Sequence, residues 1–230
     1  MVTAVFPAAG SSTRMNNFGG TNKNLLNLMG EPILIRTLKT FSQVERVNFL
    51  IVVVGEHEVE TVEKLLKATP ELKPWVVTVG GSERQFSIAN GLKLLPDDSE
   101  IVLVHDAARP LVSTKTIDEV IDAAQEFGGS IAAVPAKDTI KLVGADAFVR
   151  YTPPRRELVA VQTPQGFKRD ILLRAYQKAN DEGFLGTDDS SLVERLGIRI
   201  KVVTSGYDNL KITTPEDIFV AETLLRKERR

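Results

Sequence analysis

The sequence predicts an α/β fold in which a mostly parallel sheet carries helices on both faces, and three observations support this class. The chain has 230 residues, enough for one domain with a full core on each side of a sheet. Short apolar runs rich in β-branched residues alternate with amphipathic stretches along its length. Several of these runs, such as LIVVV at 50–54, are apolar throughout, which is typical of strands covered on both faces.

The individual elements follow from these apolar runs and amphipathic stretches. Six apolar runs are predicted as strands, namely Thr3–Phe6, Phe49–Val54, Trp75–Val79, Ile101–His105, Ser130–Val134 and Arg199–Val203. Seven amphipathic stretches are predicted as helices, namely Ile33–Ser42, Glu58–Lys67, Gln85–Leu94, Thr116–Phe127, Asp170–Asn180, Ser190–Leu196 and Glu216–Lys227. The last helix has a clear start signal, because Thr214 can cap it and Pro215 suits its first turn.

The segment Asp138–Gln162 departs from this alternation. It reads as two strand-like halves, TIKLV and ELVAVQ, around a turn-rich middle that contains proline. We therefore expect a protruding β-arm at about residues 138–162. A two-stranded arm cannot bury its apolar positions alone, so it either packs on a second subunit of a homodimer or folds back onto its own domain. The chain has no internal repeat or linker, and we expect a single domain over residues 1–230.

Composition excludes several classes of protein. The formal net charge is −1, so no general field attracts nucleic acid or an anionic membrane, and we expect neither as a partner. The absence of cysteine excludes disulfides, thiolate metal sites and a cysteine nucleophile. The sequence begins without a signal peptide pattern and has no apolar window of about 18 residues, so we expect a cytoplasmic protein.

The first predicted strand ends in a loop of small residues, PAAGSSTRM at 7–15. Such a loop lets a ligand approach the backbone, and the successive N–H groups that follow Pro7, from Ala8, Ala9, Gly10 and their neighbours, can cradle phosphates. It matches neither G-x-G-x-x-G nor the P-loop pattern, which disfavours a dinucleotide site and a P-loop NTPase. Arg14 and Lys23 can neutralise a triphosphate, although solvated basic residues beside an ordinary turn would look the same.

Two further motifs follow predicted strands. GGSERQFS at 80–87 places two glycines before a helix, which suits backbone contacts to a base or phosphate, but a simple capped helix has the same pattern. HDAARP at 105–110 places an acid at the carboxyl edge of a buried strand, where α/β folds bind ligands. An aspartate that only shapes a turn is the alternative.

Basic and hydroxyl side chains flank the arm and recur near the end of the chain. DTIK at 138–141 and TPQ at 163–165 bracket the arm, and Arg155 and Arg156 lie between them. Hydroxyls and guanidinium groups suit a phosphate monoester, and a solvated arm tip is the alternative. DNLKIT at 208–213 adds an acid and a lysine before the last helix.

Taken in order, these motifs resemble those of the 2-C-methyl-D-erythritol 4-phosphate cytidylyltransferases. The matching elements are PAAG with Arg-Met, a lysine followed by LxLxGxPIL, GGxxRxxS, HDAARP, RxxL with TPQ, and DNxKxT. The likeness spans nearly the whole chain and implies a Rossmann-like three-layer nucleotidyltransferase fold. The chain departs from the family at Ser12, where glycine is usual, and at Asn22 and Asn24, where the family has proline and glutamine around the lysine.

The resemblance implies a set of site residues. Catalytic cations are Arg14, Lys23 and Lys211. Nucleotide-binding residues are Pro7, Ala8, Ala9, Gly10, Gly81, Ser82, Ser87, Asp106 and Ala107. Acceptor-binding residues are Asp106, Arg109, Thr139, Arg155 and Thr163, with Arg155 reaching into the neighbouring subunit's site. Candidate metal contacts are Asp106 and Asp208.

The resemblance also implies the reaction. Its substrates are CTP and a polyol phosphate, its cofactor is Mg²⁺ or another divalent cation, and its products are pyrophosphate and 4-diphosphocytidyl-2-C-methyl-D-erythritol, an isoprenoid precursor. A ribitol-5-phosphate cytidylyltransferase is the nearest alternative, though its relatives tend to begin LAGG. A sugar-phosphate uridylyltransferase is disfavoured by PAAG and HDAARP. A nucleotide-binding protein that has lost turnover is the alternative from a different class.

Overall fold

The structure, a computed structural model, describes residues 1–10 and 22–228. Its centre is a seven-stranded sheet with the strand order β11-β7-β10-β6-β1-β4-β5. Its strands, in chain order, are β1 (Val2–Pro7), β4 (Val47–Val54), β5 (Trp75–Val79), β6 (Ile101–Val104), β7 (Gly129–Pro135), β10 (Val159–Lys168) and β11 (Lys201–Thr204). Neighbouring strands run parallel, except that β10 runs antiparallel to both β6 and β7. The predicted mostly parallel sheet is confirmed.

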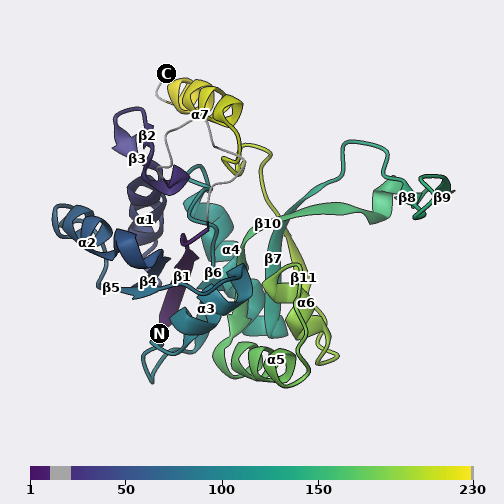
Figure 1. The fold of residues 1–230 in the computed structure, drawn as a ribbon, viewed down its shortest axis with the longest axis horizontal. Helices are drawn as coiled ribbons and strands as arrows, with labels where there is room; N and C mark the ends of the chain where they lie inside the picture. Colours follow the sequence, from purple (N-terminus) through teal and green to yellow (C-terminus); the bar gives the residue numbers. More distant parts are fainter. Residues whose placement is uncertain (11–21, 229–230) are drawn as a thin grey trace.

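Helices cover both faces of this sheet (Figure 1). One core cluster joins the sheet to α1 (Ile33–Gln43), α2 (Val59–Lys67) and α4 (Thr114–Phe127). The second cluster joins the other face to α3 (Arg84–Leu92), α5 (Arg169–Asp181) and α6 (Asp189–Glu194). Every predicted helix and strand is present, with ends displaced by at most two residues.

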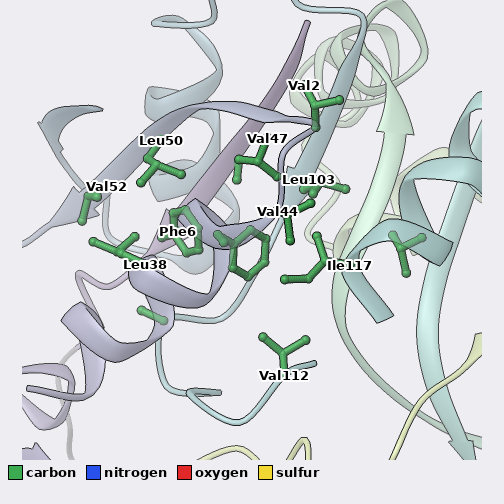
Figure 2. Packing of buried hydrophobic residues seen from close by; sticks show 14 of the residues in the cluster. Val2, Phe6, Leu38, Val44, Val47, Leu50, Val52, Leu103, Val112 and Ile117 are labelled. Carbon is green, nitrogen blue, oxygen red and sulfur yellow. The ribbon is translucent and has the colours of Figure 1, made fainter. Parts of the chain in front are cut away.

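Side-chain alternation along the central strands explains the two cores. On β1, Ala4 and Phe6 point into the first cluster, whereas Val5 points into the second. Phe6, which Figure 2 shows among its buried neighbours, meets Phe41 of α1 edge-to-face, with ring centroids 4.9 Å apart. The strand must therefore be apolar at consecutive positions, which is the pattern visible in the sequence.

The arm differs in its pairing from the sequence-based prediction. Figure 1 shows the segment between β7 and β10 projecting away from the sheet, with β8 (Leu142–Val143) and β9 (Val149–Tyr151) near its tip. A hairpin would pair the two halves TIKLV and ELVAVQ with each other, but the structure does not pair them. Instead β8 pairs with β9, while Val159–Val161 of β10 pairs with β7. The second half therefore enters the main sheet, because β7 offers it a strand edge of the same apolar character.

The C-terminal helix α7 (Pro215–Glu228) packs away from the main sheet. A small cluster holds it against the two-stranded sheet of β2 (Asn27–Leu28) and β3 (Glu31–Pro32), and its buried members are Leu28, Ile33, Ile212 and Ala221. The carboxylate of Asp217 accepts the N–H groups of Thr213 at 2.7 Å and Thr214 at 2.8 Å, which anchors the loop before the helix. Within the described residues, no helix is long and apolar enough to cross a bilayer.

Candidate active site

The sequence motifs gather at one edge of the sheet. The parallel strands β1, β5 and β6 end there, so the PAAG, GGSERQFS and HDAARP motifs that follow them lie at the same edge. The antiparallel strand β10 brings Thr163 to this edge, because Gln165 pairs with Val104, the last residue of β6. The chain order and the sheet order together build one site from segments that are far apart in sequence.

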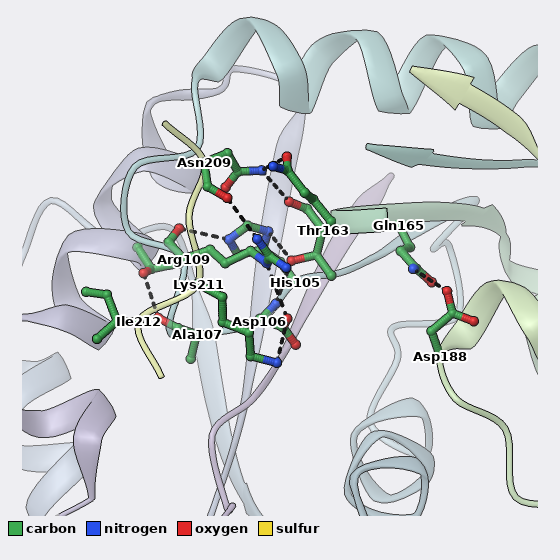
Figure 3. Close-up of polar contacts among 12 residues, drawn as sticks. His105, Asp106, Ala107, Arg109, Thr163, Gln165, Asp188, Asn209, Lys211 and Ile212 are labelled. Atoms are coloured by element: carbon green, nitrogen blue, oxygen red, sulfur yellow. Dashed lines mark hydrogen bonds and ion pairs between the residues drawn. The ribbon is translucent and has the colours of Figure 1, made fainter. Parts of the chain in front are cut away.

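Asp106 is the charged centre of this site (Figure 3). Its side chain is buried, with the residue 8% exposed. Lys211 Nζ lies 3.0 Å from Oδ2, Arg109 Nε lies 3.4 Å from Oδ2, and Arg84 Nε lies 3.4 Å from Oδ1. Burial alone would raise the pKa of Asp106, but the charges of Lys211, Arg84 and Arg109 outweigh it and hold the pKa well below its ordinary value. The carboxylate is therefore ionised at neutral pH.

His105 supports this centre as a neutral group. Burial lowers the pKa of His105 to about 3, and its ring packs against Phe41 with centroids 4.7 Å apart. Thr163 Oγ1 accepts the N–H of Asp106 at 3.0 Å and lies 3.1 Å from His105 Nδ1. The hydroxyl proton is thus available to Nδ1, and Nε2 donates to the carbonyl of Arg109 at 3.2 Å. Both ring nitrogens are used in holding the HDAARP turn.

A loop from the C-terminal part of the chain closes the site. Asn209 is buried and donates from Nδ2 to the carbonyl of Thr163 at 2.9 Å, and its own carbonyl accepts from Arg109 Nη1 at 2.8 Å. Ile212 N donates to the carbonyl of Ala108 at 2.8 Å. Lys23 Nζ donates to the carbonyl of Ile212 at 2.9 Å. Lys211 is thus held beside Asp106 on a loop that Lys23 also contacts.

The two-glycine turn lies beside the loop after β1. A Cβ at Gly80 would collide with the Cβ of Ala9, so only glycine allows the two loops to approach this closely. Ser87 Oγ accepts from Gly81 N at 3.1 Å and lies 3.1 Å from the carbonyl of Glu83. The Ser87 hydroxyl therefore shapes the turn, and Ser82 remains exposed on its surface.

A buried ion pair behind the turn links this helix to Asp106. Asp189 is 1% exposed and accepts from Arg84 Nη1 at 2.9 Å and from Tyr176 Oη at 2.5 Å. Burial opposes ionisation of Arg84, but the charges of Asp189 and Asp106 raise its pKa. Arg84 thereby bridges two buried carboxylates, one of which is the centre of the site.

Comparison with known proteins agrees with the sequence motifs. Residues 2–227 match the IspD family, described as 2-C-methyl-D-erythritol 4-phosphate cytidylyltransferase. The chain belongs to this family. The 2-C-methyl-D-erythritol 4-phosphate cytidylyltransferase of Caldanaerobacter subterraneus subsp. tengcongensis is 47% identical over 227 residues, which is 98% of this chain and 99% of that one. The Bacillus cereus protein of the same name is 44% identical over 230 residues, all of both chains.

Solved structures of cytidylyltransferases from this family superpose on the fold. The 4-diphosphocytidyl-2C-methyl-D-erythritol synthase of Anaerococcus prevotii has a TM-score of 0.88 at 32% identity, covering 98% of this chain and 96% of that one. The 2-C-methyl-D-erythritol 4-phosphate cytidylyltransferase of Thermus thermophilus has a TM-score of 0.79 at 31% identity, covering 97% and 98%. The Rossmann-like three-layer nucleotidyltransferase fold expected from the motifs is confirmed.

Some described residues expected from the family resemblance are exposed and do not belong to the buried cluster around Asp106. Thr139 and Arg155 are exposed on the arm, where Arg155 Nη1 donates to the carbonyl of Lys137 at 3.0 Å. Asp208 is exposed beside the buried Asn209. Arg14 lies outside the described residues, as does Ser12.

Sequence reasoning missed three contributors to the site, namely Arg84, Asp189 and Asn209. Arg84 lies within GGSERQFS, but no feature of that motif tells that its side chain reaches Asp106. Asp189 follows Asp188, which caps α6 by accepting from Ser191 N at 2.9 Å, so the acid pair has the sequence pattern of an ordinary helix start. The burial of Asp189 against Tyr176 depends on helix packing, which the local sequence does not reveal.

Proposed function

We propose that this chain transfers the cytidylyl group of CTP to 2-C-methyl-D-erythritol 4-phosphate at the sheet edge around Asp106. The family match over residues 2–227 supports this activity and favours methylerythritol phosphate over ribitol phosphate as the acceptor. The chain is accordingly a nucleotidyltransferase of non-mevalonate isoprenoid precursor synthesis. Its products are 4-diphosphocytidyl-2-C-methyl-D-erythritol and pyrophosphate.

The acceptor supplies its own nucleophile. A phosphate monoester has a second pKa of about 6 and is mostly dianionic at neutral pH, so it needs no general base. One of its oxygens forms a bond to the α-phosphorus of CTP, and the bond from that phosphorus to the bridging oxygen of the β-phosphate breaks as pyrophosphate leaves. His105 is excluded as a base in this scheme, because both of its ring nitrogens are committed to hydrogen bonds within the fold.

The arrangement of cations around Asp106 carries the proposal. Ionised Asp106 holds the ammonium of Lys211 at 3.0 Å, and Lys23 contacts the carbonyl of the next residue, Ile212. Two lysines from opposite ends of the chain are thereby brought to one loop, where they can stabilise the charge that develops on the phosphates. Arg14 completes this set in the proposal.

Substrate-binding roles follow the same edge of the sheet. In the proposal, the backbone of 7–10 and of Gly81 and Ser82 contacts the nucleotide, with Ser87 supporting the turn, and Asp106 and Ala107 face the ribose and the acceptor. Arg109 donates to Asp106 and to the carbonyl of Asn209, and Thr163 forms a hydrogen bond with His105. These bonds are consistent with a role in shaping the acceptor side of the site. Direct contacts of Arg109 and Thr163 to the acceptor remain predictions.

The residues fit a divalent cation carried mainly by the substrate. Among the described residues, no group of three His, Asp or Glu side chains gathers as a metal site. Asp106 is a buried carboxylate that can supply a ligand, whereas Asp208 is exposed and belongs to no such group. We propose Mg²⁺ bound chiefly through phosphate oxygens and water, which is its usual habit with nucleotides. When bound, the ion neutralises part of the triphosphate charge.

The arm supports a homodimer in the proposal. Its exposed apolar side chains include Phe148, which is 74% exposed, together with Leu142, Val149 and Tyr151. A short two-stranded hairpin with exposed apolar residues is marginally stable alone, and a second copy of the chain would bury them. Arg155 at the base of the arm would then contact the acceptor phosphate in the partner's site.

The experiment compares Lys23→Ala with the control Lys67→Ala, which truncates an exposed lysine of α2. Pyrophosphate release is measured with Mg²⁺ and CTP, using methylerythritol phosphate or ribitol phosphate as acceptor and UTP as a control nucleotide. We expect Lys23→Ala to lower kcat by roughly 10²–10³-fold, with the unfolding temperature unchanged and Lys67→Ala unaffected. An unchanged kcat in correctly folded Lys23→Ala would remove Lys23 from the mechanism.

The unmodified chain tests the alternatives in the same assay. Turnover with ribitol phosphate would keep the chemistry and change the acceptor. The absence of turnover with either acceptor would favour the nucleotide-binding alternative.

A further inference from the structure

Two asparagines flank Lys23 and share one backbone carbonyl. Asn22 Nδ2 donates to the carbonyl of Ala8 at 2.7 Å, and Asn24 Nδ2 donates to the same oxygen at 3.2 Å. A carbonyl oxygen has two lone pairs, so both are occupied. Ala8 is itself fixed, because it is buried and its N–H donates to the carbonyl of Val53 at 2.7 Å. The lysine segment is thus tied to the end of β1 from both sides of Lys23.

The two side chains also bond to each other and cap a short helix. Asn22 Oδ1 accepts from Asn24 N and from Asn24 Nδ2, both at 3.0 Å, at the start of the 3₁₀ turn η2 (Lys23–Leu25). The Asn22 side chain therefore determines where the turn begins. It also sets the direction in which the Lys23 side chain leaves the backbone.

A third tie connects Asn22 to the end of β4. The second donor of its amide goes to Glu58 Oε2 at 3.0 Å, and the same oxygen accepts from Gly55 N at 2.9 Å. Glu58 is buried and is itself held by Gly55 N, so this bond fixes Asn22 against an immobile side chain. Asn22 Nδ2 therefore donates both of its protons, one to the carbonyl of Ala8 after β1 and one to the carboxylate of Glu58 after β4.

Lys23 is the residue that this network holds. Its Nζ reaches across to the carbonyl of Ile212 at 2.9 Å, next to Lys211. We infer that Asn22 and Asn24 are positioning residues for Lys23, orienting its ammonium toward the reacting phosphates. The inference depends on the proposed role of Lys23 in catalysis.

The side-chain oxygen of Asn24 indicates that this residue serves to position Lys23. Its Oδ1 is buried and, within the described residues, has no hydrogen-bond partner, which is a cost to stability. An apolar side chain of similar size would avoid that cost. It would also leave both acceptors served, because Ala8 O retains Asn22 Nδ2 and Asn22 Oδ1 retains Asn24 N. Stability alone therefore does not explain an asparagine here.

The test uses Asn24→Leu, with Asn180→Leu as the matched control, because Asn180 is exposed on α5. Steady-state kinetics of pyrophosphate release and thermal unfolding are measured on the same preparations. We expect kcat of Asn24→Leu to fall about tenfold or more, since small displacements of a catalytic group are costly, while KM for both substrates changes little. Its unfolding temperature should stay within about 3 °C of the unmodified chain. Unchanged kcat, or a loss of kcat only alongside a clear loss of stability, would overturn the inference.

A second pair of variants tests the contact to Glu58. Asn22→Asp keeps the acceptor for Asn24 N but puts a carboxylate against Glu58 and Ala8 O, so kcat should fall. Adding Glu58→Gln removes one of the two facing carboxylates and leaves a carbonyl oxygen that can still accept from Gly55 N, so at least part of the lost kcat should return. No recovery in the double variant contradicts the network. If Lys23→Ala leaves kcat unchanged, the catalytic role of Lys23 is refuted. If Lys23→Ala lowers kcat but the asparagine variants leave it unchanged, only the positioning role is refuted.

Discussion

Replacing Asp189 with asparagine should destabilise the fold through the buried pair behind the site. The change removes the charge that holds Arg84 Nη1 at 2.9 Å but preserves the size of the side chain and one carbonyl acceptor. Breaking a buried ion pair costs about 3–5 kcal/mol in general. The expected cost here is smaller, about 2 kcal/mol, because a charged hydrogen bond is lost while Arg84 keeps Asp106 as a partner and is partly solvated.

Thermal and urea unfolding measure this loss. In a chain of this size, about 2 kcal/mol corresponds to a fall of about 4–8 °C in unfolding temperature. Tyr176→Phe removes the other hydrogen bond to Asp189 and should cost about 1 kcal/mol. Glu60→Gln removes an exposed pair with Lys64 and should cost less than about 0.5 kcal/mol.

Activity should fall in Asp189→Asn as well. Arg84, released from Asp189, turns further toward Asp106 and competes with Lys211 for that carboxylate. We expect kcat to drop about tenfold, since the displaced group is Lys211. An unfolding temperature equal to that of Glu60→Gln, with kcat unchanged, would refute the reasoning, because the buried pair would then contribute neither stability nor alignment.

Two further predictions concern pH and the arm. His105 has a pKa of about 3 in the fold against about 6.5 unfolded, so its contribution to stability is full above about pH 6.5 and is lost as pH falls, by up to about 1.4 kcal/mol per pH unit. The unfolding free energy of His105→Asn should therefore fall less steeply between pH 6.5 and 4, and parallel curves for the two proteins would contradict this. Arg155→Ala should raise KM for the acceptor at least about tenfold, because the proposed contact to its phosphate would be lost. An equal mixture of Arg155→Ala and Lys23→Ala chains should regain about a quarter of full activity through hybrid dimers with one intact site, and no gain on mixing would argue against a shared site.

The local character of most elements could be predicted from sequence. Apolar runs such as 50–54 are typical of strands buried on both faces. The Thr-Pro pair at 214–215 indicates where α7 begins, because proline suits the first turn of a helix. These signals are carried by residues within a few positions of each other. They therefore do not depend on which elements later become neighbours.

The arm shows where this reasoning stops. ELVAVQ has strand character in either arrangement, and its sequence is equally compatible with pairing to TIKLV or to β7. The structure pairs Val159–Val161 with β7 and continues the strand to Lys168 between β6 and β7. Strand pairing is a long-range choice, decided by which edge is open, so the residues of the strand do not encode it alone.

In the candidate site, too, some features could be predicted from sequence and others depend on the tertiary structure. The sequence by itself determined the motif residues: Asp106, Lys23 and Lys211 stand at strand ends and in loops where ligands bind, and their order identified the family. Only the tertiary structure decided that Lys211 sits 3.0 Å from Asp106, that Arg84 spans Asp106 and Asp189, and that Asn22 and Asn24 hold Lys23 to Ala8. Residue type and chain order set which chemistry is available, whereas distance, burial and pKa arise where segments 14 to 105 positions apart meet at one sheet edge.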